Sequence, residues 1–302
     1  MRLAKRVLVV LVLLVLVGGF AVWRRPVSCY WESMYVLDWF EGVESSNVMV
    51  GGHRVHYEVE GPAAGTPVVL VHGLGGRAED WRNLAPLIAK AGFRVYLPDL
   101  IGYGRSEKPA DFSYSVHDEA KVVLGFMDAL GLQKVDLGGW SMGGAIVQHV
   151  AAADPERVQQ LMLFDSAGLF VLPKWDIALF TPRSDAEVAR LDALLMPNPP
   201  KVPHFVAKDI LRVSDHRAWI IHRALDSMLT GQDATDKLLP KLTMPVLILW
   251  GAEDQITPES QGETMHTLIP QSKLVVIPGC GHLAPGQCAA QMASPVVDFL
   301  KK

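Results

Sequence analysis

The sequence predicts an α/β fold with a mostly parallel sheet flanked by helices. Short apolar runs of four to six residues recur along the chain, and stretches with helical periodicity separate them. Such apolar runs are typical of strands that are buried on both faces of a parallel sheet. The alternation breaks after residue 168 and resumes at residue 244. One interrupted alternation indicates a single α/β domain that carries an insertion.

The elements are expected in a definite order. A hairpin over residues 47–61 turns at Gly51-Gly52, because two glycines between alternating runs are a hairpin signal. The further strands are predicted at residues 67–73, 93–99, 134–139, 158–165, 244–251 and 273–279, with helices near residues 79–91, 116–130, 142–154 and 288–301.

The insertion covers residues 169–241. It contains apolar residues at helical spacing, several prolines and no good strand, which favours a helical cap. The core is then divided into residues 47–168 and 242–302.

The first residues form the clearest regional anomaly. The basic start MRLAKR precedes an uncharged apolar run from Val7 to Trp23, and Arg24 and Arg25 close it. We expect residues 1–25 to be an uncleaved, single-pass membrane anchor, with a cleaved signal peptide as the alternative. Positive charge flanks both ends, so the side of the membrane is undetermined. The aromatic residues of 26–46 suit an amphipathic juxtamembrane segment or a helix that packs on the folded domain.

Composition limits the partners. The formal net charge is −4, and no basic stripe indicates a nucleic-acid surface. The cysteines Cys29, Cys280 and Cys288 have no C-x-x-C spacing, so we expect neither a disulfide framework nor a zinc site. No metal or cofactor is implied, and the oligomeric state is undetermined.

Glycines crowd around Ser141 in the stretch GGWSMGGA, directly after a predicted strand and before a predicted helix. A sharp strand-to-helix turn strains its central residue and requires small neighbours two positions away on either side. Gly139 and Gly143 meet that requirement. The turn would lift the Ser141 hydroxyl above the carboxyl edge of the sheet, where the following helix N-terminus favours negative charge.

Three more motifs accompany this turn. His72-Gly73-Leu74-Gly75-Gly76 follows a core strand, and Asp99 to Ser106 reads D-x-x-G-x-G-x-S. Asp254 and His282 follow the last two predicted strands, in the order Ser…Asp…His. From about residue 47 to 302 the chain therefore resembles the α/β-hydrolases.

This resemblance implies roles for the motif residues. Ser141 would be the nucleophile, His282 the base that activates it, and Asp254 the acid that orients His282. Glu253 and Asp165 are rival positions for the acid. The backbone N–H groups of Leu74 and Met142 would form the oxyanion hole.

The nucleophile, the cap and the resemblance together predict a class of substrate. A serine nucleophile favours carboxylic-ester hydrolysis, and an apolar cap suits an acyl chain. We expect Trp140, Leu169 and Phe170 to contact the substrate. The apparent anchor, FDSAGLF and MPVLILWGAEDQITP together resemble membrane-anchored monoacylglycerol lipases. The alternatives are a carbon–carbon bond hydrolase of ring-cleavage dienoates, against which Leu283 counts because those enzymes carry Trp there, and a non-catalytic binding protein.

Overall fold

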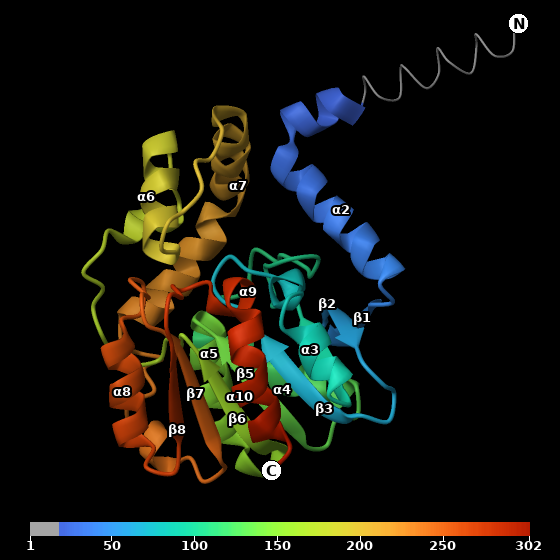
Figure 1. Ribbon diagram of the computed structural model, residues 1–302, viewed down its shortest axis with the longest axis vertical. Helices are drawn as coiled ribbons and strands as arrows, with labels where there is room; N and C mark the ends of the chain where they lie inside the picture. Colours follow the sequence, from blue (N-terminus) through green and yellow to red (C-terminus); the bar gives the residue numbers. More distant parts are fainter. Residues whose placement is uncertain (1–17) are drawn as a thin grey trace, which may run out of the picture.

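The computed structural model describes residues 18–302, and Figure 1 shows a twisted sheet with helices on both faces. Within these residues the sheet has eight strands in the order β1-β2-β4-β3-β5-β6-β7-β8. The β1–β2 and β2–β4 pairs are antiparallel, and the other pairs are parallel. The strands are β1 (Glu44–Val50), β2 (His53–Glu60), β3 (Thr66–Val71), β4 (Phe93–Pro98), β5 (Val135–Trp140), β6 (Val158–Phe164), β7 (Val246–Gly251) and β8 (Lys273–Ile277).

Helices cover the two faces of the sheet and enclose two hydrophobic cores. One core involves α4 (Val116–Ala129), α5 (Met142–Ala153) and α8 (Glu259–Leu268). The other involves α3 (Ala85–Lys90) and α10 (Ala289–Leu300). Strand β3 supplies both cores, because successive side chains of a strand point to opposite faces. The short elements are α9 (Ala284–Gln287), η1 (Ala78–Trp81), η2 (Pro155–Arg157) and η4 (Leu239–Lys241).

The chain between β6 and β7 forms a helical cap. It contains η3 (Ile177–Phe180), α6 (Asp185–Leu195) and α7 (His204–Leu229), and Figure 1 shows α6 and α7 projecting from one end of the sheet. Ser184 caps the N-terminus of α6, because its hydroxyl accepts a hydrogen bond from the N–H of Glu187.

The prediction of a mostly parallel sheet flanked by helices is confirmed, but one of the predicted helices is interrupted. The single helix predicted near residues 79–91 is divided into η1 and α3. Pro86 lies in the first turn of α3, where its missing N–H costs nothing, and it fixes the start of that helix.

The prediction of an N-terminal membrane-spanning helix is wrong for the part of the chain that the structure describes. No helix in residues 18–302 is long and apolar enough to cross a bilayer. A crossing needs about 20 apolar residues, whereas α2 (Pro26–Phe40) has 15 and carries Glu32 and Asp38. The first part of the predicted anchor, residues 1–17, lies outside the described residues. The predicted single-pass, membrane-anchored localisation depended on a spanning helix, and the same finding contradicts it.

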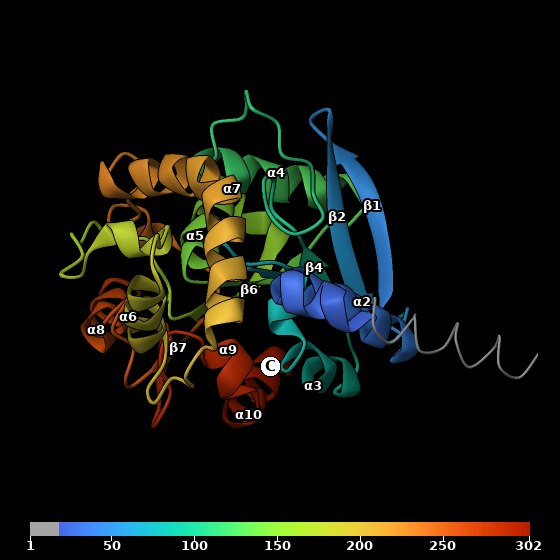
Figure 2. The same cartoon turned by 90° about the horizontal axis from the view of Figure 1, so that it is seen from above.

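Helix α2 packs on both the core and the cap. The Arg82 guanidinium lies 3.1 Å from the Asp38 carboxylate, and the N–H of Val27 donates a 3.0 Å hydrogen bond to Asp209 on α7. Figure 2, seen from above, shows α2 between α7 and the β1–β2 hairpin. Residues 26–46 thus form a docked helix followed by the first residues of β1.

Candidate active site

Ser141 occupies the sharp turn between β5 and α5. Its backbone has φ 55° and ψ −122°, a strained conformation for any residue with a side chain. A Cβ added to Gly139 would collide with the backbone of Gly143, and one added to Gly143 would collide with the carbonyl of Val71. Only glycine fits these two positions, which explains the G-x-S-x-G spacing.

A continuous chain of hydrogen bonds joins Ser141, His282 and Asp254. The Ser141 Oγ lies 2.8 Å from His282 Nε2, and His282 Nδ1 lies 2.8 Å from Asp254 Oδ2. The three residues are 9%, 2% and 6% exposed, so solvent competes little for these bonds. The fold therefore brings together three side chains that lie far apart in the sequence.

The turn after β7 holds the Asp254 carboxylate in place. Its Oδ1 accepts hydrogen bonds from the N–H groups of Ile256 and Thr257 at 2.8 and 2.9 Å. Its Oδ2 accepts a 2.7 Å bond from the Thr257 hydroxyl in addition to the bond from His282. With these donors the carboxylate can stay buried and still orient the imidazole.

The two rival acids lie elsewhere. Glu253 is exposed, and neither it nor Asp165 makes a hydrogen bond to His282 within residues 18–302. Asp165, at the end of β6, accepts a 2.6 Å bond from the N–H of Gly251. Burial, and secondly the charge of Asp254, raise the pKa of the Asp165 carboxyl well above its usual range. The raised pKa favours the protonated form of Asp165, which lies beside Asp254 and makes no hydrogen bond to His282.

The loop after β3 places Leu74 beside Ser141, and both residues line the same cavity. A Cβ on Gly73 would lie 3.0 Å from the Ser141 Cβ, so the loop and Ser141 are in close contact. His72 braces the loop, because its Nδ1 donates to the Gly73 carbonyl and its Nε2 accepts from the Leu100 N–H. Burial lowers the pKa of His72 to about 4, which keeps it neutral. Met142 is the first residue of α5, so its N–H has no partner within the helix.

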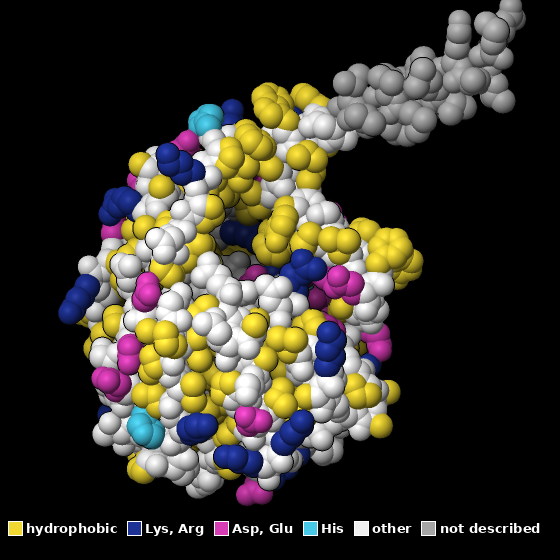
Figure 3. Space-filling view, in the orientation of Figure 1, with side chains coloured by type: hydrophobic (Ala, Val, Ile, Leu, Met, Phe, Trp, Pro, Cys, Tyr) yellow, Lys and Arg dark blue, Asp and Glu magenta, His cyan; other side chains and the backbone are white. Residues whose placement is uncertain are grey.

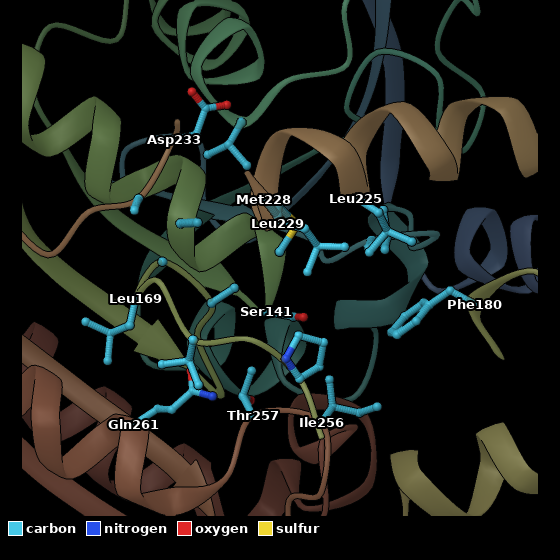
Figure 4. A pocket seen from close by; sticks show the side chains of 18 of the residues that line it. Ser141, Leu169, Phe180, Leu225, Met228, Leu229, Asp233, Ile256, Thr257 and Gln261 are labelled. Atoms are coloured by element: carbon cyan, nitrogen blue, oxygen red, sulfur yellow. The ribbon is translucent and has the colours of Figure 1, made fainter. Parts of the chain in front are cut away.

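A cavity of about 800 Å³, counted with its opening, extends from Ser141 beneath the cap. Figure 4 shows aliphatic and aromatic side chains around it. The lining includes Leu74, Val116, Ala145, Leu169, Val171, Trp175, Phe180, Leu225, Met228, Leu229, Ile256, Thr257 and Gln261. Such a lining suits an apolar chain attached to a group that reacts at Ser141.

Of the three residues predicted to contact the substrate, one lines the cavity and two do not. Leu169 lines the cavity. Trp140 lies outside this lining, where its indole N–H donates a 2.7 Å hydrogen bond to the His282 carbonyl. Phe170 is 51% exposed and also lies outside the lining.

Several lining residues were not among the predicted substrate contacts. Phe180, Leu225, Met228 and Leu229 lie in the apolar cap segments 169–180 and 217–231, whose composition suggests an apolar lining, and the helical spacing on α7 was a signal for the last three. Gln261 had no such signal, because it reaches the cavity from α8. Within residues 18–302 no group of His, Cys, Asp and Glu side chains could hold a metal ion.

The expectation of no disulfide is wrong. Cys280 and Cys288 form a disulfide with Cα atoms 6.3 Å apart, and Cys29 is free. The eight-residue separation carries no recognised signature, and only the loop around His282 brings the two thiols together.

Comparison with known proteins places the chain in a family. The alpha/beta hydrolase fold family matches residues 66–209 and 229–286, so the chain belongs to this family. Lipase 3 of Moraxella sp. (strain TA144) is 28% identical over 84% of this chain and 83% of its own length. The 2-hydroxymuconate semialdehyde hydrolase of Pseudomonas sp. (strain CF600) is 32% identical over 84% and 92%.

A solved structure is similar over nearly the whole chain. It is the crystal structure of a membrane phospholipase A, with a TM-score of 0.82, 26% identity and 98% coverage of both chains. The resemblance to α/β-hydrolases is confirmed, and these three relatives are all hydrolases by name. None of the three is a monoacylglycerol lipase, so the narrower resemblance is not confirmed.

Proposed function

We propose that the chain is a serine carboxylic-ester hydrolase that forms an acyl-enzyme on Ser141. The observation that carries the proposal is the hydrogen-bond chain from Ser141 through His282 to Asp254, at the inner end of an apolar cavity. A serine hydroxyl is a weak nucleophile near neutral pH unless a base takes its proton. His282 Nε2 is within hydrogen-bond reach of that proton, and Asp254 fixes the opposite ring nitrogen.

The first half of the reaction acylates Ser141. The Ser141 Oγ attacks the ester carbonyl carbon while His282 takes the hydroxyl proton, and Asp254 stabilises the resulting imidazolium. The N–H groups of Leu74 and Met142 donate to the oxyanion, with about 3 kcal/mol of stabilisation for each donor. The imidazolium then gives its proton to the leaving alcohol as the carbon–oxygen bond breaks.

The second half releases the acid. Water attacks the acyl carbon, and its proton passes to His282. Collapse of the second tetrahedral intermediate breaks the bond to Ser141, which regains a proton from His282. The cycle needs no group beyond these residues and water.

The cavity supports an acyl chain as the part of the substrate bound under the cap. Its lining is mainly aliphatic and aromatic, and it begins at Ser141. The names of the Moraxella lipase and of the phospholipase point in the same direction. We therefore propose short-to-medium-chain lipid esters as the substrate class, monoacylglycerols among them.

A specific observation favours a second candidate. The relative with 32% identity is a 2-hydroxymuconate semialdehyde hydrolase, and carbon–carbon hydrolysis of a dienoate could use the same serine and histidine. A binding protein without activity is the third reading, and the complete hydrogen-bond chain counts against it.

The test is hydrolysis of p-nitrophenyl esters of increasing acyl length by the full chain. Ser141→Ala should abolish turnover while thermal unfolding stays the same, and the exposed Ser294→Ala is the matched control. Turnover that peaks at medium chain length supports the lipid-ester assignment. Full activity of Ser141→Ala refutes the nucleophile, and turnover of ring-cleavage dienoates alone favours the second candidate.

A further inference from the structure

Two arginines beside the glycine loop form no ion pair within residues 18–302. Arg77 follows the loop that carries Leu74, and Arg217 lies on α7. Neither guanidinium makes an ion pair or a recorded hydrogen bond within residues 18–302. Other arginines in this part of the chain do pair with carboxylates: Arg82, Arg94, Arg105, Arg157 and Arg212. Arg24, Arg25, Arg183 and Arg190 also lack such a partner but are exposed, so Arg77, which is buried, and Arg217, which is half-buried, are distinguished by lacking one away from solvent.

Helical spacing turns Arg217 toward the site. Ile221 lies one turn further along α7, and its Cδ1 would lie 3.8 Å from a Cβ built on Gly75. Leu225, one more turn along, lines the cavity. Residues four apart share one face of a helix, so Arg217 lies on the face of α7 that looks down on the glycine loop.

Arg77 approaches from the opposite side. It is 9% exposed, and its guanidinium stacks 4.0 Å from the centre of the Trp31 ring on α2. The glycine loop, α7 and α2 therefore surround the space near these arginines. Figure 3 shows a hollow between the cap and α2, with a Lys or Arg side chain visible inside it.

The charges in this region repel one another. Burial first, and the positive charge of Arg77 second, lower the pKa of Arg217. Burial also lowers the pKa of Lys108 to about 8, and both arginines add to that effect. Lys108 is satisfied by the carbonyls of Gly104 and Ser106 at 2.9 Å, whereas the arginines are not.

The nearby carboxyl groups form no ion pair with the two arginines, although the charge of Asp99 acts to raise the pKa of Arg217 and so offsets part of this repulsion. Asp99 already accepts hydrogen bonds from the N–H groups of Ala78 and Arg105 and from His56. Asp80 accepts from the backbone of Arg77, and burial raises its pKa to about 7. Neither Asp80 nor Glu79 forms an ion pair with Arg77. An anion in the hollow would relieve the repulsion between the two guanidinium groups.

We propose that Arg77 and Arg217 form a phosphate-binding subsite, and that the substrate is an acyl ester whose alcohol carries a phosphate. The inference rests on the proposed function and narrows its substrate class. With the acyl chain in the cavity, the alcohol points toward the mouth, where the arginines lie. Two planar guanidinium forks match the several oxygens and the double charge of a phosphate monoester.

The experiment compares two esters that differ only in this charge, 1-octanoylglycerol and 1-octanoylglycerol 3-phosphate. Both are used as monomers at low ionic strength, where screening is weakest. Arg217→Gln should lower the preference for the phosphate ester about tenfold, mainly through KM, because charge-assisted hydrogen bonds are lost. Arg217→Lys, which keeps the charge and loses the fork, should lower it less. Arg190→Gln, an exposed change on α6, should leave it as in the wild type.

Two outcomes overturn the subsite. One is a wild type without preference between the esters, and the other is an Arg217→Gln effect of equal size on both. Inorganic phosphate that binds as tightly as the phosphate ester would indicate a free-anion site and refute the substrate claim.

Calorimetry separates this inference from the proposed function. Ser141→Ala should bind 1-octanoylglycerol 3-phosphate, and adding Arg217→Gln should weaken that binding about tenfold. If the wild type hydrolyses no ester while this difference persists, the proposed function fails and the phosphate subsite stands. No difference in binding refutes the subsite, whatever the turnover.

Discussion

The indole N–H of Trp140 donates a 2.7 Å hydrogen bond to the carbonyl oxygen of His282. Trp140 directly precedes Ser141, so this bond ties the turn that holds Ser141 to the loop that holds His282. The bond is buried, with Trp140 8% and His282 2% exposed. A residue that the sequence placed in substrate binding thus links two halves of the candidate site.

Trp140→Phe should therefore lower both stability and turnover. Removing the indole N–H leaves a buried carbonyl without this donor, which costs about 1–3 kcal/mol of unfolding free energy. The effect on turnover should appear in kcat more than in KM, because the imidazole is displaced from Ser141. Urea unfolding and ester kinetics measure the two effects. The control is Trp39→Phe, at a position 69% exposed, and equal effects in both variants would contradict the role of the bond.

Asp254→Asn and Asp165→Asn should behave differently. An amide at residue 254 disturbs the orientation and charge that His282 requires, and kcat should fall by about 10³–10⁴. Burial and the charge of Asp254 raise the pKa of Asp165, which favours its protonated form. The neutral amide resembles that carboxylic acid, so kcat should change less than about threefold. If Asp165→Asn lowers kcat more than Asp254→Asn does, Asp165 and not Asp254 is the acid that supports His282.

Glu58→Gln should stabilise the protein at alkaline pH. Burial, with the charges of Glu79 and Asp38, raises the pKa of Glu58 to about 9, from an ordinary value of 4.5. The folded state keeps a proton that the unfolded state releases, so stability falls as pH rises between these values. The variant should gain more than about 1 kcal/mol at pH 8. Denaturant unfolding at pH 4.5 and pH 8 measures this, and an equal change at both values would count against it.

Reduction of the Cys280–Cys288 disulfide should loosen the loop that carries His282. The disulfide closes a short ring around His282, and such a ring contributes about 2–3 kcal/mol to stability. A phosphine reductant should lower the unfolding temperature and kcat of the wild type and of Cys29→Ser alike. The double variant Cys280→Ser/Cys288→Ser should be insensitive to it. If the reductant no longer affects Cys29→Ser, the response comes from Cys29 and the role of the disulfide is contradicted.

Much of the fold and part of the candidate site could be predicted because local sequence rules dictate them. The glycines at 139 and 143 predict the turn at Ser141, since close backbone approach permits nothing larger. The order of strands and helices follows from apolar periodicity. The positions of Asp254 and His282 after the last two strands place them at the same sheet edge.

Features set by tertiary contacts could not be predicted in this way. The direction of the Trp140 indole depends on a carbonyl 142 residues away in the sequence. Phe180 reaches the cavity through packing of the cap, and Gln261 reaches it from the first turn of α8. The aromatic residues of α2 suggest a membrane interface, yet contacts with the folded domain hold this helix. The guanidinium groups of Arg77 and Arg105 stack on aromatic rings of α2, and Arg82 forms an ion pair with a carboxylate of α2. Pairing of Cys280 with Cys288 depends on the path of the loop around His282, which their eight-residue spacing does not reveal.

Helix α7 is one continuous helix of 26 residues, and Figures 1 and 2 show that its axis bends between its two ends. Asp209, on the first segment, accepts a hydrogen bond from α2, and Leu225, on the second segment, forms part of the cavity wall. Since α7 contains no proline, its backbone ladder continues through the bend and joins the two segments mechanically. The angle between the segments therefore sets how closely the cap wall approaches the acyl chain, and a change in that angle would widen or narrow the cavity.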